Sequence, residues 1–152
     1  MRKLLVVLAA LLVTLMFTPS GGWAAGTVTD GGAIPYGSKE YELVFTWVGD
    51  ASDGSVPSTA SSIAIDGYVY KITTNPDSPA PTDNYAITLT DKDGVDVLGG
   101  LGANRDTANS ETIVPKAGTI TWSTRINGTL TLNISSNTDV SATGIVRIYF
   151  YR

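Results

Sequence analysis

Apolar and polar residues alternate with a period of two over much of the chain, and this is the repeat of a β-strand. The clearest alternation covers residues 41–48. The side chains that share one face of this segment are Tyr41, Leu43, Phe45 and Trp47. Large apolar residues on a single face indicate a strand that packs against a core.

Further segments show the same pattern. They are residues 63–74, 85–90, 95–98, 128–135 and 144–152, with shorter candidates at 111–114 and 119–122.

Two of these segments carry more detailed expectations. In 63–74 the alternation places Tyr68, Tyr70 and Ile72 on one side, with a bend expected at Asp66-Gly67. The polar turn that follows 85–90 predicts a hairpin with 95–98.

No segment after residue 24 has the repeat of an amphipathic helix, and turn-forming residues recur every few positions. Residues 39–152 therefore predict an all-β domain, a single antiparallel β-sandwich or jelly-roll-like fold of about seven or eight strands. The glycine-rich residues 25–38 are expected to form a flexible leader or an irregular first strand. Residues 75–83 contain three prolines and predict an exposed loop.

Residues 1–24 have the parts of an export signal peptide. Arg2 and Lys3 give a positive start, residues 4–17 are apolar apart from Thr14, and small residues flank Trp23. The apolar run is shorter than the about 20 residues that span a bilayer. We expect cleavage after residue 24 or 25 and a secreted, periplasmic or cell-surface protein without a stable membrane span; the alternative is an uncleaved anchor.

The chain contains no histidine and no cysteine. Nucleophilic sites built on imidazole or thiolate are therefore excluded, as are the ordinary zinc, copper, haem and iron–sulfur sites. The formal net charge is −4, and the lysines and arginines are scattered singly, which argues against nucleic acid as a partner. We expect a protein that is not an enzyme and needs no cofactor.

One long run of the sequence resembles a known group of proteins. It is PTDNYAITLTDKDGVDVLGGLGANRDT at 81–107, followed by GTLTLNIS at 128–135 and GIVRIYFYR at 144–152. The run resembles small uncharacterised β-rich proteins encoded in tailed-phage genomes and prophages, over residues 63–152. The resemblance implies a virion-associated role and supplies no catalytic residues. An export signal departs from what a capsid component needs, and this favours a host-encoded, exported relative.

Asp91, Asp93 and Asp96 surround Gly94 and supply the oxygen ligands that calcium prefers. The spacing is not that of an EF-hand loop, because Val95 stands at the third ligand position of a loop that starts at Asp91, and no glutamate closes it. The simpler interpretation is a tight turn with Gly94 in the left-handed conformation, and we expect no metal.

Exposed aromatic rings on a β-sandwich can stack on sugars, whereas aromatic residues in alternating strand positions more often belong to the core. The aromatic residues in question are Trp47, Tyr68, Tyr70, Trp122, Tyr149 and Tyr151, with Tyr68 and Trp122 as the candidates for sugar binding. Carbohydrate is therefore a possible partner.

Two further hypotheses concern carboxylates and the last strand. Asp66 with Asp106 or Glu111 could form the acid and base pair of a glycosidase, although acidic residues scattered over loops usually form a solvated surface. The apolar strand 144–152 could pair with the open sheet edge of another subunit, although an internal strand is the more common outcome.

The sequence thus predicts an exported, non-enzymatic structural or interaction protein, including an assembly or surface component. The expected partner is another protein or a further copy of the chain. The alternative is a carbohydrate-binding module of the β-sandwich type.

Overall fold

The computed structural model describes residues 24–117, 120–121 and 123–152. These residues form eleven β-strands and no helix, so the predicted all-β class is confirmed. None of them forms a helix long and apolar enough to cross a membrane. The expected export signal lies outside the described residues except for Ala24.

The larger sheet has the strand order β1-β2-β11-β4-β6, and β9 also pairs with β4. All of its pairings are antiparallel. The strands are β1 (Thr27–Pro35), β2 (Glu40–Val48), β4 (Ile65–Pro76), β6 (Glu111–Ile113), β9 (Thr124–Gly128) and β11 (Thr143–Tyr151).

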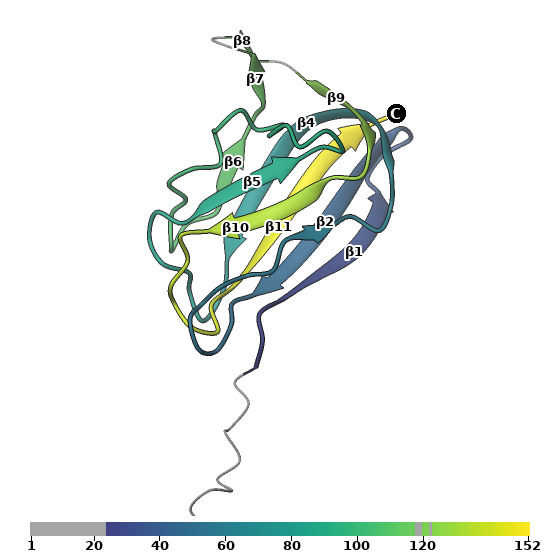
Figure 1. Ribbon diagram of the computed structural model, residues 1–152. Helices are drawn as coiled ribbons and strands as arrows, with labels where there is room; N and C mark the ends of the chain where they lie inside the picture. The colour runs from purple at the N-terminus through teal and green to yellow at the C-terminus, as the bar shows by residue number, and fades with distance from the viewer. Residues whose placement is uncertain (1–23, 118–119, 122) are drawn as a thin grey trace, which may run out of the picture.

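The smaller sheet has the order β3-β10-β5 and lies in front of the larger one in Figure 1. Its strands are β3 (Thr59–Ala60), β5 (Ala86–Thr90) and β10 (Thr131–Ser135). A two-stranded ribbon, β7 (Lys116–Ala117) with β8 (Ile120–Thr121), projects from one end. The two sheets face each other in the arrangement of a β-sandwich.

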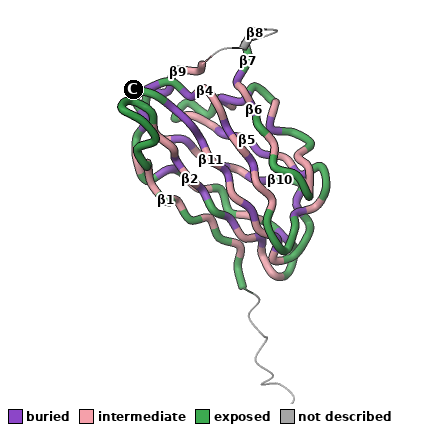
Figure 2. The backbone as a smooth tube through the Cα atoms, turned by 180° about the vertical axis from the view of Figure 1, so that it is seen from behind, coloured by how far each residue is buried: buried purple, intermediate pink, exposed green. Residues whose placement is uncertain are grey.

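The core lies between the two sheets, where buried and less buried positions alternate along each strand (Figure 2). The larger sheet contributes the predicted inner face of β2, in which Leu43, Phe45 and Trp47 are fully buried. From the smaller sheet come Ile87, Leu89, Leu132 and Ile134. The alternation predicted for 41–48, 85–90 and 128–135 is therefore confirmed, although the last of these strands begins at residue 131.

The predicted hairpin between 85–90 and 95–98 is reduced to one antiparallel bridge, between Thr90 and Asp96, and the strand expected at 95–98 is not formed. Two backbone hydrogen bonds flank the bridge, from Asp91 N–H to the Val95 carbonyl at 3.0 Å and from Val97 N–H to the Leu89 carbonyl at 2.8 Å. The Asp96 carboxylate accepts backbone N–H groups of Leu89, Leu98 and Gly100, and these bonds hold the chain in consecutive turns. The strand partner of β5 is β10.

The expectation that Tyr68, Tyr70 and Ile72 share one face is also wrong. In the β4–β11 ladder Tyr149 faces Lys71, while the next residue, Phe150, faces Val69. Tyr70 is therefore an extra residue in β4, a β-bulge, and it reverses the alternation. As a result Ile72 is buried in the core, whereas Tyr68 lies on the outer face.

Gly67, where a bend was expected, marks a close approach of two backbones. A Cβ at this position would lie 2.3 Å from the carbonyl oxygen of Tyr151. Only glycine allows β4 and β11 to come so near at this point.

Strand β11 pairs along its length with β2 on one side and with β4 on the other. Both of its edges are therefore occupied within the chain, and this contradicts the hypothesis that the C-terminal strand is donated to another subunit. The outermost strand on the β2 side is β1, formed by part of the glycine-rich 25–38 segment. Its register shifts between Asp30 and Ala33, where Gly32 has a φ of 72°.

Three loops meet at the end of the sandwich where the described chain begins. They are residues 49–58, 77–84 and 136–142. Asn137 joins them: its Nδ2 donates to the Gly54 carbonyl at 2.6 Å, and its Oδ1 accepts the Thr82 N–H at 3.0 Å. We call this part of the molecule the loop end.

Candidate functional site

The outer face of the larger sheet carries five tyrosines near the C-terminal end of β11. Two of them stand on β4, two on β11 and one in the turn after β1. These residues, which we call the tyrosine face, are Tyr36, Tyr68, Tyr70, Tyr149 and Tyr151. The bulge at Tyr70 helps to assemble them, because it keeps both tyrosines of β4 out of the core.

The rings form a continuous row across the strands. The ring centroids of Tyr68 and Tyr151 are 5.3 Å apart, with the planes only 15° from parallel. Tyr70 contacts both tyrosines of β11, at 6.0 Å to Tyr151 and 6.4 Å to Tyr149. Tyr36 meets Tyr149 edge to face at 5.5 Å. Such cross-strand pairs stabilise a sheet, by about 0.5–1.5 kcal/mol each beyond the burial of area.

Charged side chains pack on the same row. Lys71 Nζ lies 3.9 Å from the centre of the Tyr149 ring, and the Arg125 guanidinium lies 6.0 Å from the Tyr68 ring. Arg125 also forms an ion pair with Asp66 at 3.0 Å. These cations cover part of the aromatic surface while their charges stay in water.

Burial changes the titration of two of the tyrosines. It raises the pKa of Tyr70, and the negative charge of Glu40 acts in the same direction. Burial also raises the pKa of Tyr149. Both phenols therefore stay neutral at physiological pH and can donate or accept hydrogen bonds.

The orientation of the rings limits what they can bind. Tyr68 and Tyr151 stack against each other, and Arg125 lies over the Tyr68 ring as well. A sugar that binds by stacking needs a free ring face, and the ring of Tyr68 is already covered by Tyr151 and Arg125. The exposed parts, 60% of Tyr36 and 38% of both Tyr68 and Tyr151, offer a polar and aromatic surface for a broad contact.

The structure brings together four of the six aromatic residues that the sequence singled out. Tyr68, Tyr70, Tyr149 and Tyr151 all belong to the tyrosine face. Trp47 is fully buried and packs in the core near Tyr85, so it is no surface candidate. Trp122 lies outside the described residues. Tyr36 was missed, because it stands alone in a turn and no strand pattern leads to it.

The acidic turn around Gly94 is filled by internal hydrogen bonds. Asp91 Oδ1 accepts the N–H groups of Asp93 and Val95, both at 2.9 Å, and both Asp93 oxygens bind Lys92 Nζ. Gly94 has a φ of 80°, as the turn interpretation expected. Within the described ranges, no group of three or more acidic side chains is arranged to hold a metal ion.

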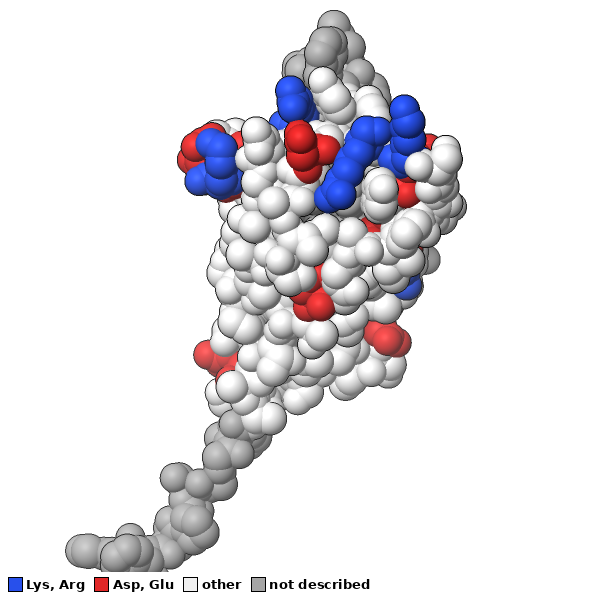
Figure 3. Space-filling view, turned by 90° about the vertical axis from the view of Figure 1, so that its right-hand side faces the viewer, with Lys and Arg blue, Asp and Glu red and all other residues white. Residues whose placement is uncertain are grey.

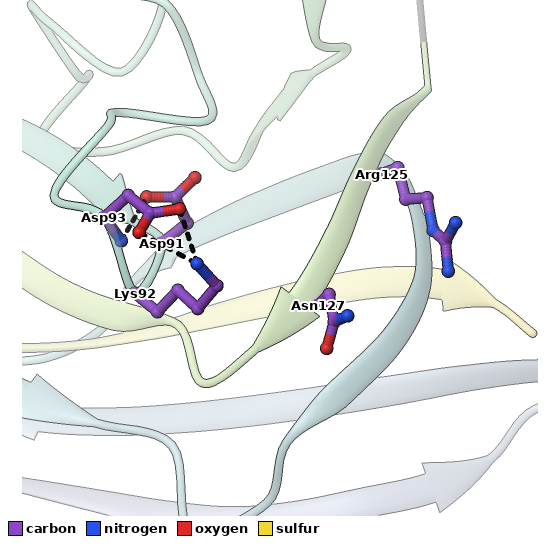
Figure 4. Close-up of a pocket in the computed structure, with 5 residues that line it drawn as sticks. All are labelled: Asp91, Lys92, Asp93, Arg125 and Asn127. Carbon is purple, nitrogen blue, oxygen red and sulfur yellow. Dashed lines mark hydrogen bonds and ion pairs between the residues drawn. The ribbon is translucent and has the colours of Figure 1, made fainter.

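A shallow hollow separates this turn from β9 (Figure 4). Lys92 folds toward Asp93, whereas Arg125 on β9 points away from the turn. Asn127 lines the hollow between them. The side chains do not converge on a common point, so the hollow offers no ready binding site for a small ligand.

The carboxylate pairs suggested for a glycosidase are not formed. Asp66 stands near the start of β4, beside Asn127 of β9, whereas Glu111 pairs with Thr74 near the end of the same strand. Thr74 stands eight positions after Asp66 on the strand, a distance of about 25 Å, whereas a glycosidase pair needs about 5–10 Å. Glu111 instead accepts the Asp106 N–H at 2.8 Å and pairs with Arg105 at 3.3 Å.

Comparison with known proteins adds no relative: no family model, no curated protein and no solved structure matches the chain. The resemblance to phage-encoded proteins therefore stays a prediction.

Proposed function

We propose that the chain is an exported, non-enzymatic interaction protein that binds a protein partner through the tyrosine face. The observation that carries this proposal is the row of five tyrosines and its packed cations on the outside of the larger sheet.

The composition of this face favours a protein partner. Tyrosine and arginine are enriched at the centres of protein interfaces, because they combine a large apolar area with hydrogen bonding. The rings on β4 and β11 are held by their neighbours, so little side-chain entropy would be lost when a partner covers them. Two rigid strands in the middle of the sheet support the surface.

The absence of enzymatic activity is proposed on chemical grounds. The whole sequence lacks histidine and cysteine, and the carboxylates suggested as a catalytic pair stand far apart. The carbohydrate-binding alternative has less support, because the stacked arrangement of Tyr68 and Tyr151 uses the ring faces that a sugar would need.

Site-specific photo-cross-linking tests the proposal in the cell that produces the protein. A photoreactive phenylalanine analogue replaces Tyr68 or Tyr151 in separate variants. The matched control carries the analogue at Val95, which is 60% exposed on the turn after β5. We expect protein adducts of defined mass from both tyrosine positions and none from Val95.

Equal adducts at all three positions, or none at the tyrosines, would contradict the proposal. A glycan array provides the second arm. Glycan binding by the wild-type protein that is lost in Tyr68→Ala, with an unchanged melting temperature, would replace the protein partner with carbohydrate.

A further inference from the structure

Of the asparagines in the sequence, only Asn127 precedes a glycine. It stands on β9, where its side chain is exposed and lines the hollow beside the Asp91–Asp93 turn (Figure 4). The close-up shows no hydrogen bond from its amide group to the other residues that line the hollow. The Asn127 amide is therefore accessible to water and is not held by these neighbours.

The other asparagines lack one or both of these features. Asn75 precedes a proline, whose nitrogen carries no hydrogen. Asn104 and Asn133 precede Arg and Ile, whose side chains hinder approach to the backbone nitrogen. Three others use their amides as hydrogen-bond donors to neighbouring oxygens: Asn84, Asn109 and Asn137.

Gly128 leaves room around its backbone nitrogen. Its φ is 132°, a conformation that residues with a side chain rarely adopt. The three atoms nearest to the position of a Cβ all belong to the flexible Lys92 side chain, at 3.3 Å or more. Gly128 is also the last residue of β9, which pairs with β4 alone among the described strands. The end of such a strand opens transiently, so the Asn127–Gly128 peptide can reach the rotation that ring closure needs.

From these features we infer that Asn127 is a site of spontaneous deamidation in the folded protein. Hydroxide removes the proton of the Gly128 N–H, and the backbone nitrogen attacks the side-chain carbonyl carbon, Cγ, of Asn127. A C–N bond forms and closes a five-membered imide ring, while the bond from Cγ to Nδ2 breaks and Nδ2 leaves as ammonia with a proton from water. Water then opens the ring at either carbonyl, which gives aspartate or isoaspartate. Only the protein and water react, and nothing is oxidised or reduced.

The product alters the pairing of β9 with β4. Asn127 lies directly opposite Asp66 in this ladder, and two carboxylates in facing positions repel each other. Arg125 already pairs with Asp66 at 3.0 Å, so it does not fully balance a second carboxylate. Isoaspartate also adds a methylene group to the backbone, which shifts the register of the ladder. Since β9 buries only Ile126, deamidation loosens this strand.

Tandem mass spectrometry of the folded protein during storage in mildly alkaline buffer tests the inference. We expect one mass unit to be gained at residue 127 at least about tenfold faster than at Asn133, where the β-branched Ile134 hinders ring closure. The rate should rise with pH, because hydroxide starts the reaction. Asn127→Gln is the matched variant: it keeps an amide at the same exposed position, but the longer side chain closes a ring much more slowly, so ammonia release should fall.

Hydrogen exchange measures the effect on the strand. Asn127→Asp reproduces one product, and its amides in 124–128 should exchange at least about threefold faster than those of the wild type. Aged wild-type protein should show the same change. Asn133→Asp is the control, since it adds the same charge on β10 opposite the uncharged Thr88 and should leave exchange in β9 unchanged. Circular dichroism verifies that all variants are folded.

The inference is wrong if conversion at Asn127 is no faster than at Asn133, or if it begins only after urea unfolds the chain, because the strand then protects this residue. Equal exchange of β9 in the wild type and in both aspartate variants would exclude the loosening of this strand.

Discussion

Gly144 in β11 leaves the space that the Trp47 indole fills. A Cβ at this position would lie 2.8 Å from three atoms of the indole ring, and Trp47 is fully buried. The ring also packs near Tyr85, which directly precedes β5 of the smaller sheet, with centroids 5.9 Å apart. Because Gly144 has no side chain, Trp47, the largest residue of the core, has room to pack between the two sheets.

Replacement of Gly144 by alanine should lower the free energy of unfolding by about 1–3 kcal/mol, because an added methyl group overpacks the core. Gly37→Ala is the control, since the atoms nearest to its Cβ are 3.4 Å away and belong to a flexible glutamate. Urea unfolding measures both variants. Trp47→Phe in the Gly144→Ala background should recover part of the loss, and strictly additive effects would contradict the contact.

Ionisation of Tyr85, a core residue, should make the stability of the fold depend on pH in the alkaline range. Burial raises the pKa of Tyr85 to about 12, whereas an unfolded tyrosine titrates near 10. Between these values the folded protein holds a proton that the unfolded chain has released, so stability falls as pH rises from about 10 to 12. Below pH 10 this contribution is fully present.

Urea unfolding at several pH values measures this dependence. In Tyr85→Phe the decline between pH 10 and 12 should be shallower than in the wild type, although Tyr70 and Tyr149 still contribute in the same direction. Parallel curves for the two proteins would show that Tyr85 titrates as it does in the unfolded chain.

At the scale of elements, strands with a strict alternation could be predicted from the sequence. Residues 41–48 and 144–152 place large apolar side chains at every second position, and both became central strands with a buried face. Short strands such as β3 and β9 could not be found. β9 buries only Ile126 and owes its extended form to pairing with β4.

The tyrosine face could be predicted only in part, for a related reason. Its members were recognised as aromatic strand residues, but the face on which Tyr68 and Tyr70 lie depends on a bulge that is visible only in the pairing of β4 with β11. The strand predicted for 95–98 is not formed for a comparable reason: the hydrogen bonds of the Asp96 side chain hold this segment in turns despite its strand-like pattern. Local alternation cannot reveal a long-range register.

Asn137 shows how one buried side chain fixes several loops. It is 8% exposed and bonds to the 49–58 and 77–84 loops at once. Asn137→Ala should lower the free energy of unfolding by about 1–3 kcal/mol, because the half-buried Thr82 N–H and the buried Gly54 carbonyl lose their partner. Hydrogen exchange should accelerate at Thr82 and in 49–58 while β2 stays protected; unchanged exchange in these loops would contradict this role.

At the scale of the whole molecule, the sandwich has one outer surface that combines a row of rings with packed cations. Figure 3 shows most of the visible Lys and Arg side chains gathered, with acidic side chains among them, at the end of the sandwich away from the start of the described chain. The core explains the fold, but it does not require tyrosines on the outside of β4 and β11. We propose that the aromatic row, besides its cross-strand contacts, binds another protein.

Hydroxyl-radical footprinting of the protein in the cells that produce it tests this contact most directly. The reactivity of Tyr36, Tyr68 and Tyr151 in the cells is compared with that of the dilute purified protein in high salt, and Val95 serves as an exposed reference on another surface. We predict that the three tyrosines are protected in the cells, at least about threefold, while Val95 reacts equally in both samples. Equal reactivity of the tyrosines in both samples would contradict the proposal that this face binds a partner.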